Sequence, residues 1–256
     1  MIYLIATGYW LVLWLTAPPD AASNLKLSYP EVPFIDFVRQ RFLELLVGAS
    51  DDAAGLVAGL TIGERGAISE ELANQMKQLS LTHLVAVSGA NLAIVIGVVY
   101  LVAARLGLSR NLRFSSALAV MGAYVLLVGP ESSVIRAATM AVFVMVGLWV
   151  GRGTNPLAAL CLAVIFLLAI DPGLAVDIGF GLSALATAGL LVLAPKLYLV
   201  FESKMPKLLA IGIAATVSAQ LYTLPIVLYL QPSLPIYSVL ANLLVEPLVA
   251  PITILG

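Results

Sequence analysis

Long apolar runs separated by short polar breaks dominate the pattern of this chain. Runs that approach the ~20 residues needed to cross a bilayer predict transmembrane helices. We place eight such spans, at about residues 2–17, 84–106, 113–129, 134–150, 156–170, 175–195, 208–230 and 236–256. The pattern therefore predicts an all-α integral membrane protein, a polytopic helical bundle of about eight transmembrane spans.

The one long polar stretch, residues 18–83, lies between the first two spans and contains two predicted helices. In the first, Asp36, Gln40 and Glu44 line one face. The apolar positions Ile35, Val38, Phe42, Leu45 and Leu46 line another. This pattern predicts an amphipathic helix that lies in the membrane interface.

A second helix is predicted to follow Ser69 as its N-cap, because Glu70 and Glu71 then fall in the first turn, where the helix dipole favours them. Its apolar stripe is Leu72, Met76 and Leu79.

Basic and non-basic short loops alternate along the chain, which predicts its orientation. Loops 107–114, 151–155 and 196–207 carry Arg or Lys, whereas the loops between them carry none. Positive loops face the cytoplasm, so both termini are expected there. The 18–83 stretch is predicted to face outward although it carries five basic residues, because the rule loses force in long loops. The chain then divides into a first span (1–20), an extracytoplasmic segment (21–83) and a transmembrane domain (84–256) in the cytoplasmic (inner) membrane. No polar tail follows the last span, so we expect a longer protein that continues beyond the C-terminus.

Composition supports a membrane protein and excludes several kinds of site. Of the 256 residues, 61% are apolar and 11% are charged, against about 25% charged in soluble domains. The net charge of −1 does not predict a surface that binds polyanions. The single cysteine, Cys161, and the single histidine, His83, exclude a disulfide framework, a zinc site with several histidines and bis-His haem. No metal or other cofactor is predicted.

Polar groups inside predicted spans are costly and are functional candidates by default. The richest cluster opens the second span, where His83, Ser88 and Asn91 share, with Val87, roughly 140° of one helix face. This cluster could line the outer mouth of a polar pathway. It could equally be a helix–helix contact held by Ser and Asn hydrogen bonds.

Arg136 enters the fourth span from the outer side. A guanidinium keeps its charge, so it must face protein, water or an anion. The sequence leaves two partners possible for this guanidinium: a structural carboxylate such as Glu131 or Asp177, or a phosphate group.

Breaks in the later spans mark further candidates. Asp177 opens the sixth span just before Gly179 and Gly181, which permit irregular backbone where a cavity exists. Prolines are predicted to break the last two spans. Glu246 lies beside such a break. It indicates either a hydrated interior or a protonated carboxyl that donates a hydrogen bond to a backbone carbonyl left free by the break. The other candidates are Ser183, Gln220 and Asn242.

Five short segments resemble motifs of the ComEC competence-protein family, in the family's order. Residues 83–91 (HLVAVSGAN) are similar to its HLLAISGLHV-type signature, with Asn91 where many members have histidine. Residues 59–65 (GLTIGER) resemble LLLGdR. Residues 133–137 (SVIRA) resemble SxxRA and are followed by Gly151 and Arg152. Residues 171–184 resemble DP…GFQLSF, with Gly181 for glutamine and Ala184 for an aromatic residue. Residues 242–247 (NLLVEP) resemble NLLxxP.

The resemblance implies a channel that passes single-stranded DNA across the cytoplasmic membrane during natural transformation. His83, Ser88, Asn91 and Arg136 would line the outer part of the path, and Gln220 and Glu246 a deeper part. Asp177, Ser183 and Asn242 complete the predicted lining. The implied partners are DNA, an extracellular DNA-delivery protein and a cytoplasmic helicase-like motor. A homo-oligomer is left open.

Two other functions compete with the channel. A secondary transporter of a small solute or ion would suit Asp177, Glu246 and broken helices, although no internal repeat of the kind common in transporters is visible. A serine hydrolase would need Ser88 within hydrogen-bond reach of His83. Five residues apart on a helix, these side chains point about 140° from each other. Family members often carry a metallo-β-lactamase-like domain, but its site needs several histidines, so we expect no enzymatic activity.

Overall fold

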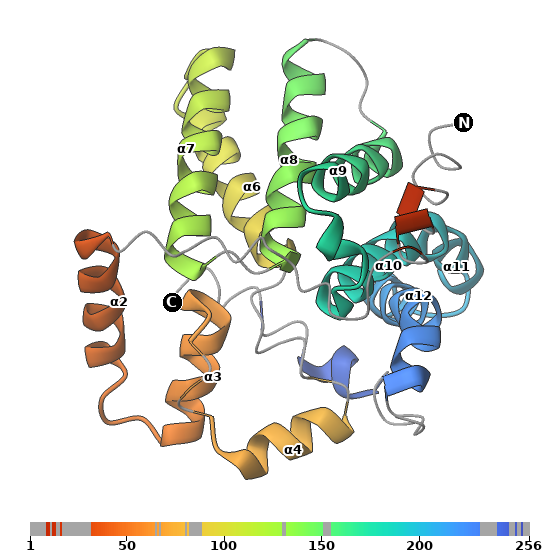
Figure 1. Ribbon diagram of the computed structural model, residues 1–256, viewed down its shortest axis with the longest axis horizontal. Coiled ribbons are helices and arrows are strands. Elements are labelled where there is room, and N and C mark those ends of the chain that lie inside the picture. Colours follow the sequence, from red (N-terminus) through yellow and green to blue (C-terminus); the bar gives the residue numbers. More distant parts are fainter. Residues whose placement is uncertain are drawn as a thin grey trace. The chain divides into compact units, whose positions relative to one another are not determined.

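The regular structure of the described residues in the computed structural model is helical, apart from an isolated bridge between Val47 and Ala49 (Figure 1). This confirms the predicted all-α class. The structure describes residues 9–10, 12–13, 16, 32–64, 66, 68–79, 81, 89–129, 132–150, 155–230, 240–245, 249 and 252. The chain forms two compact units. We call residues 28–138 with 235–256 the motif unit, and residues 1–27 with 139–234 the second unit.

The motif unit contains α2 (Pro33–Leu45), α3 (Asp51–Ile62), α4 (Glu70–Gln78), α6 (Gly89–Arg105), α7 (Arg110–Val128) and the first turns of α8 (Ser132–Trp149). Helices α6 and α7 pack against each other (Figure 1). Ser109 caps α7 by accepting a hydrogen bond from the backbone N–H of Leu112 at 3.4 Å. Because of this cap, α7 begins three residues before the predicted span.

Helix α4 forms as its sequence predicts. The Ser69 hydroxyl accepts a hydrogen bond from the backbone N–H of Leu72 at 3.2 Å, so Ser69 is the N-cap. Met76 is buried together with Leu81. Their partly buried neighbours come from α3, from α4 and its flanks, and from residues 240–245: Leu56, Ile68, Leu72, Leu79, Ala241 and Val245. The apolar stripe of α4 thus packs against the helical residues 240–245 of the same unit.

Helix α2 also forms, but the apolar face that was predicted to lie in the membrane interface is partly covered by protein. No residue of α2 is buried. Of the predicted apolar face, the residues Ile35, Val38, Phe42 and Leu46 are half-buried, whereas Leu45 is exposed. The helix contacts α3 and α7, so the face predicted for the membrane interface is the one partly covered by protein.

The second unit contains the rest of α8, α9 (Pro156–Ile170), the 3-10 helix η1 (Pro172–Ala175), α10 (Ile178–Val192), α11 (Ala194–Phe201) and α12 (Lys207–Leu230). Trp10 belongs to this unit: its ring lies 5.6 Å from that of Phe180, and its indole N–H donates to the carbonyl of Ala175 at 3.1 Å. Helices α10 and α12 make the main packing contact of the unit.

Small residues allow α10 and α12 to approach closely. Ala210, Ala214 and Ser218 recur every four residues on α12 and are fully buried. On α10, a Cβ added at Gly189 would lie 2.5 Å from the carbonyl oxygen of Ser218. Such spacing of small residues brings helix backbones together in membranes.

Two described helices are long and apolar enough to cross a membrane: α7 and the Lys207–Tyr229 part of α12. The pair α10 and α11, bent by 44° at their junction, adds a third if it counts as one span. The apolar helices α6, α8 and α9 are shorter. Four predicted spans agree with α7, α8, α9 and α12 to within three residues, but the number of eight spans stays a prediction. Most of residues 2–17 and 236–256 lie outside the described part.

Three local expectations were wrong. Residues 196–201, expected in a loop, belong to α11, because Pro195 starts a new helix and apolar residues continue it. Gly179 and Gly181 lie in regular helix, because Asp177 caps α10. Helix α12 also continues through Pro225, which removes one backbone donor without ending the helix. Pro247 and Pro251 lie outside the described residues.

Candidate functional site

The C-terminal end of α3 is buried within the motif unit. Residues 58–62 are all buried, although the last carbonyls of a helix have no partner within it. Gly63 ends the helix with a φ of 74°, in the left-handed region that favours glycine. A Cβ there would lie 2.9 Å from the carbonyl oxygen of Val128. The end of α3 therefore abuts the end of α7 directly.

Two side chains from other helices satisfy carbonyls at this end of α3. The Asn91 amide, in the first turn of α6, donates to the carbonyl of Leu60 at 3.3 Å. The Arg39 guanidinium of α2 donates to the carbonyl of Ile62 at 3.1 Å. Asn91 is only 1% exposed. Its bond to Leu60 shows that Asn91 holds a helix–helix contact, one of the two roles left open by the sequence.

The first turns of α6 and α8 also meet. A Cβ added at Gly89 would lie 2.8 Å from the Cβ of Ala137 and 3.6 Å from Nη2 of Arg136. The glycine therefore lets the Arg136 guanidinium lie directly against the start of α6. Arg136 itself is 4% exposed. A buried guanidinium is costly unless its donors are paired, so its surroundings must be polar.

These contacts join three of the five motif segments. Residues 59–65 contact residues 83–91 through the Leu60–Asn91 bond, and residues 83–91 contact residues 133–137 through Gly89. We call this arrangement the three-segment junction, defined by Leu60, Gly63, Gly89, Asn91 and Arg136. His83 and Ser88 belong to the same motif segment but lie outside the described residues.

Other buried polar groups in the motif unit come from the fifth segment and from α7. Asn242 is buried, and its Oδ1 atom has no hydrogen-bond partner among the described residues. The same is true of the Tyr124 hydroxyl on α7. Glu246 lies outside the described part of the chain. Tyr124 gave no signal in the sequence, because one tyrosine in an apolar helix resembles any core aromatic.

The remaining predicted residues belong to the second unit. The Asp177 carboxylate accepts a hydrogen bond from the backbone N–H of Phe180 and is the N-cap of α10. Ser183 and Gln220 are half-buried on α10 and α12. The predicted lining residues with described side chains thus fall into two sets, one in each unit.

Sequence reasoning missed two buried hydroxyls on α12. Thr216 and Ser218 are buried, and their hydroxyl oxygens have no partner within the described residues. The spacing of Ala210, Ala214 and Ser218 was the available signal, because small residues every four positions mark a helix contact. The described residues contain no group of three His, Cys, Asp or Glu side chains arranged to hold a metal ion.

Comparison with known proteins identifies the family. The sequence model of the competence-protein family matches residues 60–256. ComE operon protein 3 of Bacillus subtilis (strain 168) is 31% identical over 196 residues, which is 77% of this chain and 25% of that relative. The chain therefore spans about a quarter of the length of this relative. No solved structure matches the chain significantly. The matched region includes every residue of the three-segment junction, and the chain belongs to the competence-protein family.

Proposed function

We propose that this chain is the membrane-embedded part of a channel that carries single-stranded DNA across the cytoplasmic membrane during natural transformation. Membership in the competence-protein family supports a role in DNA uptake. The apolar helices α7 and α12, with the bent pair α10 and α11, support embedding in a membrane. In this proposal the chain crosses eight times, both termini are cytoplasmic, and the protein moves DNA without enzymatic chemistry.

The observation that carries the proposal is the buried guanidinium of Arg136 at the three-segment junction. A permanent charge held at membrane depth is expensive, and such groups mark substrate paths. Arginine also recognises phosphate through charge-assisted hydrogen bonds. We place Arg136 with His83 and Ser88 at the outer part of the DNA path. Asn91 contributes by holding α6 against α3.

The proposed lining also includes residues of the second unit. Gln220 and Ser183 lie on α12 and α10, the main packing pair of that unit, and Asp177 begins α10. Glu246 and Asn242 would contribute from the C-terminal segment. A channel should hold its cargo weakly at many sites, so few charged residues are compatible with passage. The proposed partners are single-stranded DNA, an extracellular DNA-delivery protein and a cytoplasmic helicase-like motor.

Uptake of labelled DNA into the cytosol tests this function. The full-length parent protein replaces the native channel of a competent host, and membrane levels are matched by immunoblot. Variants Arg136→Ala and Ser88→Leu are expected to bind DNA outside and fail to import it. Lys77→Ala removes an exposed cation of α4 and is the matched control, with import expected to stay at the wild-type level.

The outcomes separate the hypotheses. Normal import by Arg136→Ala and Ser88→Leu would remove both residues from the path. If the wild type imports no DNA at normal membrane levels, the channel proposal fails and a secondary transporter becomes the better hypothesis. Gradient-dependent uptake of a solute into proteoliposomes would then support the transporter.

A further inference from the structure

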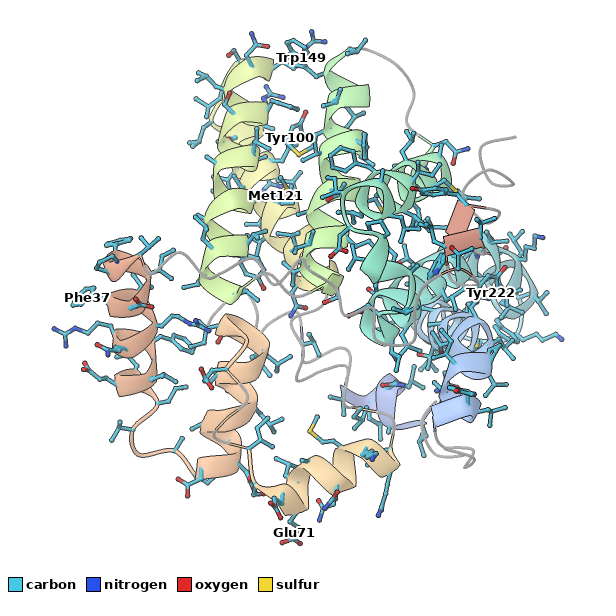
Figure 2. The ribbon with its side chains drawn as sticks, viewed as in Figure 1. Phe37, Glu71, Tyr100, Met121, Trp149 and Tyr222 are labelled. Atoms are coloured by element: carbon cyan, nitrogen blue, oxygen red, sulfur yellow. The ribbon has the colours of Figure 1, made fainter. Side chains whose placement is uncertain are left out.

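Helix α2 exposes two large aromatic residues on the side that does not hold it to α3. Phe34 is 71% exposed and Phe37 is 54% exposed. Figure 2 shows Phe37 projecting from α2 on the side turned away from α3. On the opposite side, the Arg39 guanidinium reaches the carbonyl of Ile62. One face of α2 is thus fixed to protein, while an aromatic face has no covering protein among the described residues.

The contacts of α3 set the position of this aromatic face relative to α7. Helices α2 and α3 are in contact and are joined by only five residues, 46–50, so they run antiparallel. The N-terminal half of α2 therefore lies next to the C-terminal end of α3. That end abuts the end of α7 at Val128. Phe34 and Phe37 are accordingly near the level at which α7, a candidate membrane span, ends.

An ion pair of exposed side chains follows the two aromatic residues along α2. Arg41, one turn beyond Phe37, lies with its guanidinium carbon 5.5 Å from the centre of the Phe37 ring. It also pairs with Glu44 at 2.9 Å, and both side chains are exposed. Aromatic residues concentrate at the boundary between hydrocarbon and headgroups, and an arginine beside them keeps its charge in the polar layer. Leu45, 82% exposed, lies a further turn away from α7.

We propose that Phe34 and Phe37 form an aromatic anchor that inserts into the lipid boundary beside the outer end of α7, with Arg41 and Glu44 at headgroup level and Leu45 in water. The proposal rests on the membrane embedding proposed above. It differs from the sequence prediction, in which the Ile35–Leu46 face entered the membrane. The apolar surface of α7 continues to this level, since Leu126 is exposed within the last turn.

The charges of α2 define the kind of lipid that the anchor needs. The helix carries Asp36 and Glu44 against Arg39 and Arg41, so its formal charge is two minus two, or zero. Binding of basic segments to anionic lipid depends on excess positive charge. Insertion is therefore expected to be the same in phosphatidylcholine vesicles and in vesicles that contain phosphatidylglycerol.

Site-directed spin labelling tests the anchor in the full-length protein. Cys161, and any other cysteine of the full-length protein, is first replaced by alanine. A nitroxide is then attached singly at Phe34→Cys, Phe37→Cys, Gln40→Cys, Leu45→Cys and Leu126→Cys, in protein reconstituted into phosphatidylcholine vesicles. Accessibility to molecular oxygen, which concentrates in lipid, is compared with accessibility to a water-soluble nickel chelate.

Positions 34, 37 and 126 are expected to be more accessible to oxygen than to the nickel chelate, and positions 40 and 45 the reverse. A preference for the nickel chelate at 34 and 37, with position 126 still lipid-exposed, would overturn the anchor alone. The same preference at position 126 would overturn the membrane embedding of α7 and the anchor with it. Spin–spin broadening at 34 or 37 that disappears on dilution with unlabelled protein would show that a second copy covers this face, which also overturns the proposal.

Discussion

Replacing Gly189 with alanine is expected to destabilise the contact between α10 and α12. The added Cβ would lie 2.5 Å from the carbonyl oxygen of Ser218, 3.0 Å from its carbonyl carbon and 3.1 Å from Cγ of Tyr222. Ordinary contact begins at 3.4 Å, so the two backbones must separate by about 0.9 Å. The nearest obstacle is backbone, which cannot turn away as a flexible side chain does.

The cost follows from this separation. A gap of 0.5–1 Å removes roughly a quarter to a half of the dispersion energy at each affected contact. Overpacking of this kind destabilises proteins by about 1–3 kcal/mol. Gly97 on α6 is the matched control, because a Cβ there meets nothing within 4 Å. In a helix, alanine is favoured over glycine by about 0.8–1 kcal/mol, so Gly97→Ala is expected to be neutral or stabilising.

Thermal unfolding in detergent measures both variants, followed by the loss of the monodisperse peak in size-exclusion chromatography. Both alanines gain the same helix propensity, so Gly189→Ala is expected to unfold several degrees below Gly97→Ala, and Gly97→Ala at or above the wild type. If Gly189→Ala unfolds at the temperature of Gly97→Ala or higher, α10 and α12 do not approach as closely as described.

Substitutions at three further positions test the junction and the helix caps. Asn91→Leu leaves the buried Leu60 carbonyl without its donor and is expected to cost about 1–3 kcal/mol in the same unfolding assay, whereas Asn91→His keeps an N–H donor and should cost less. Gly63→Ala places a Cβ 2.9 Å from the Val128 oxygen at a positive φ and is expected to lower the unfolding temperature; an unchanged temperature would contradict the described end of α3. Asp177→Ala should cost about 1 kcal/mol by removing the cap of α10, and Asp177→Asn, which can still cap, should not. DNA uptake by both Asp177 variants separates capping from a role in the path. If Asp177→Asn has normal stability but loses uptake, passage of DNA depends on the negative charge of Asp177.

The positions of most helices could be predicted from the sequence, because hydropathy and capping residues are local signals. Ser69 predicted the start of α4, and the apolar run at 156–170 predicted α9 to the residue. The helix of α11 was missed because Lys196 marked the segment as a loop, whereas Pro195 and the following apolar residues favour a helix. Charge in that case was the weaker signal.

The candidate site was predictable only in part, because a motif names residues without saying which of them touch. The five motif segments pointed to Asn91 and Arg136. Nothing local indicated that Asn91 bonds to Leu60, or that Gly89 lies against Ala137. Similarly, helical periodicity located one apolar face of α2, but it did not indicate that protein partly covers this face while Phe34 and Phe37 stay exposed. These pairings depend on residues far apart in the chain, which a pattern of local hydropathy does not encode.

The ribosome synthesises α3 before most of the groups that contact its C-terminal end. Arg39 precedes α3 in the chain, so the α2–α3 pair can form early, but Asn91 and Val128 are synthesised later. At about 5–20 residues per second, the ribosome takes roughly 3–13 s to proceed from Ile62 to Val128. During the first part of this interval the Asn91 side chain, which donates to the Leu60 carbonyl, has not yet been synthesised. The closing of the three-segment junction therefore follows the synthesis of α6 and α7.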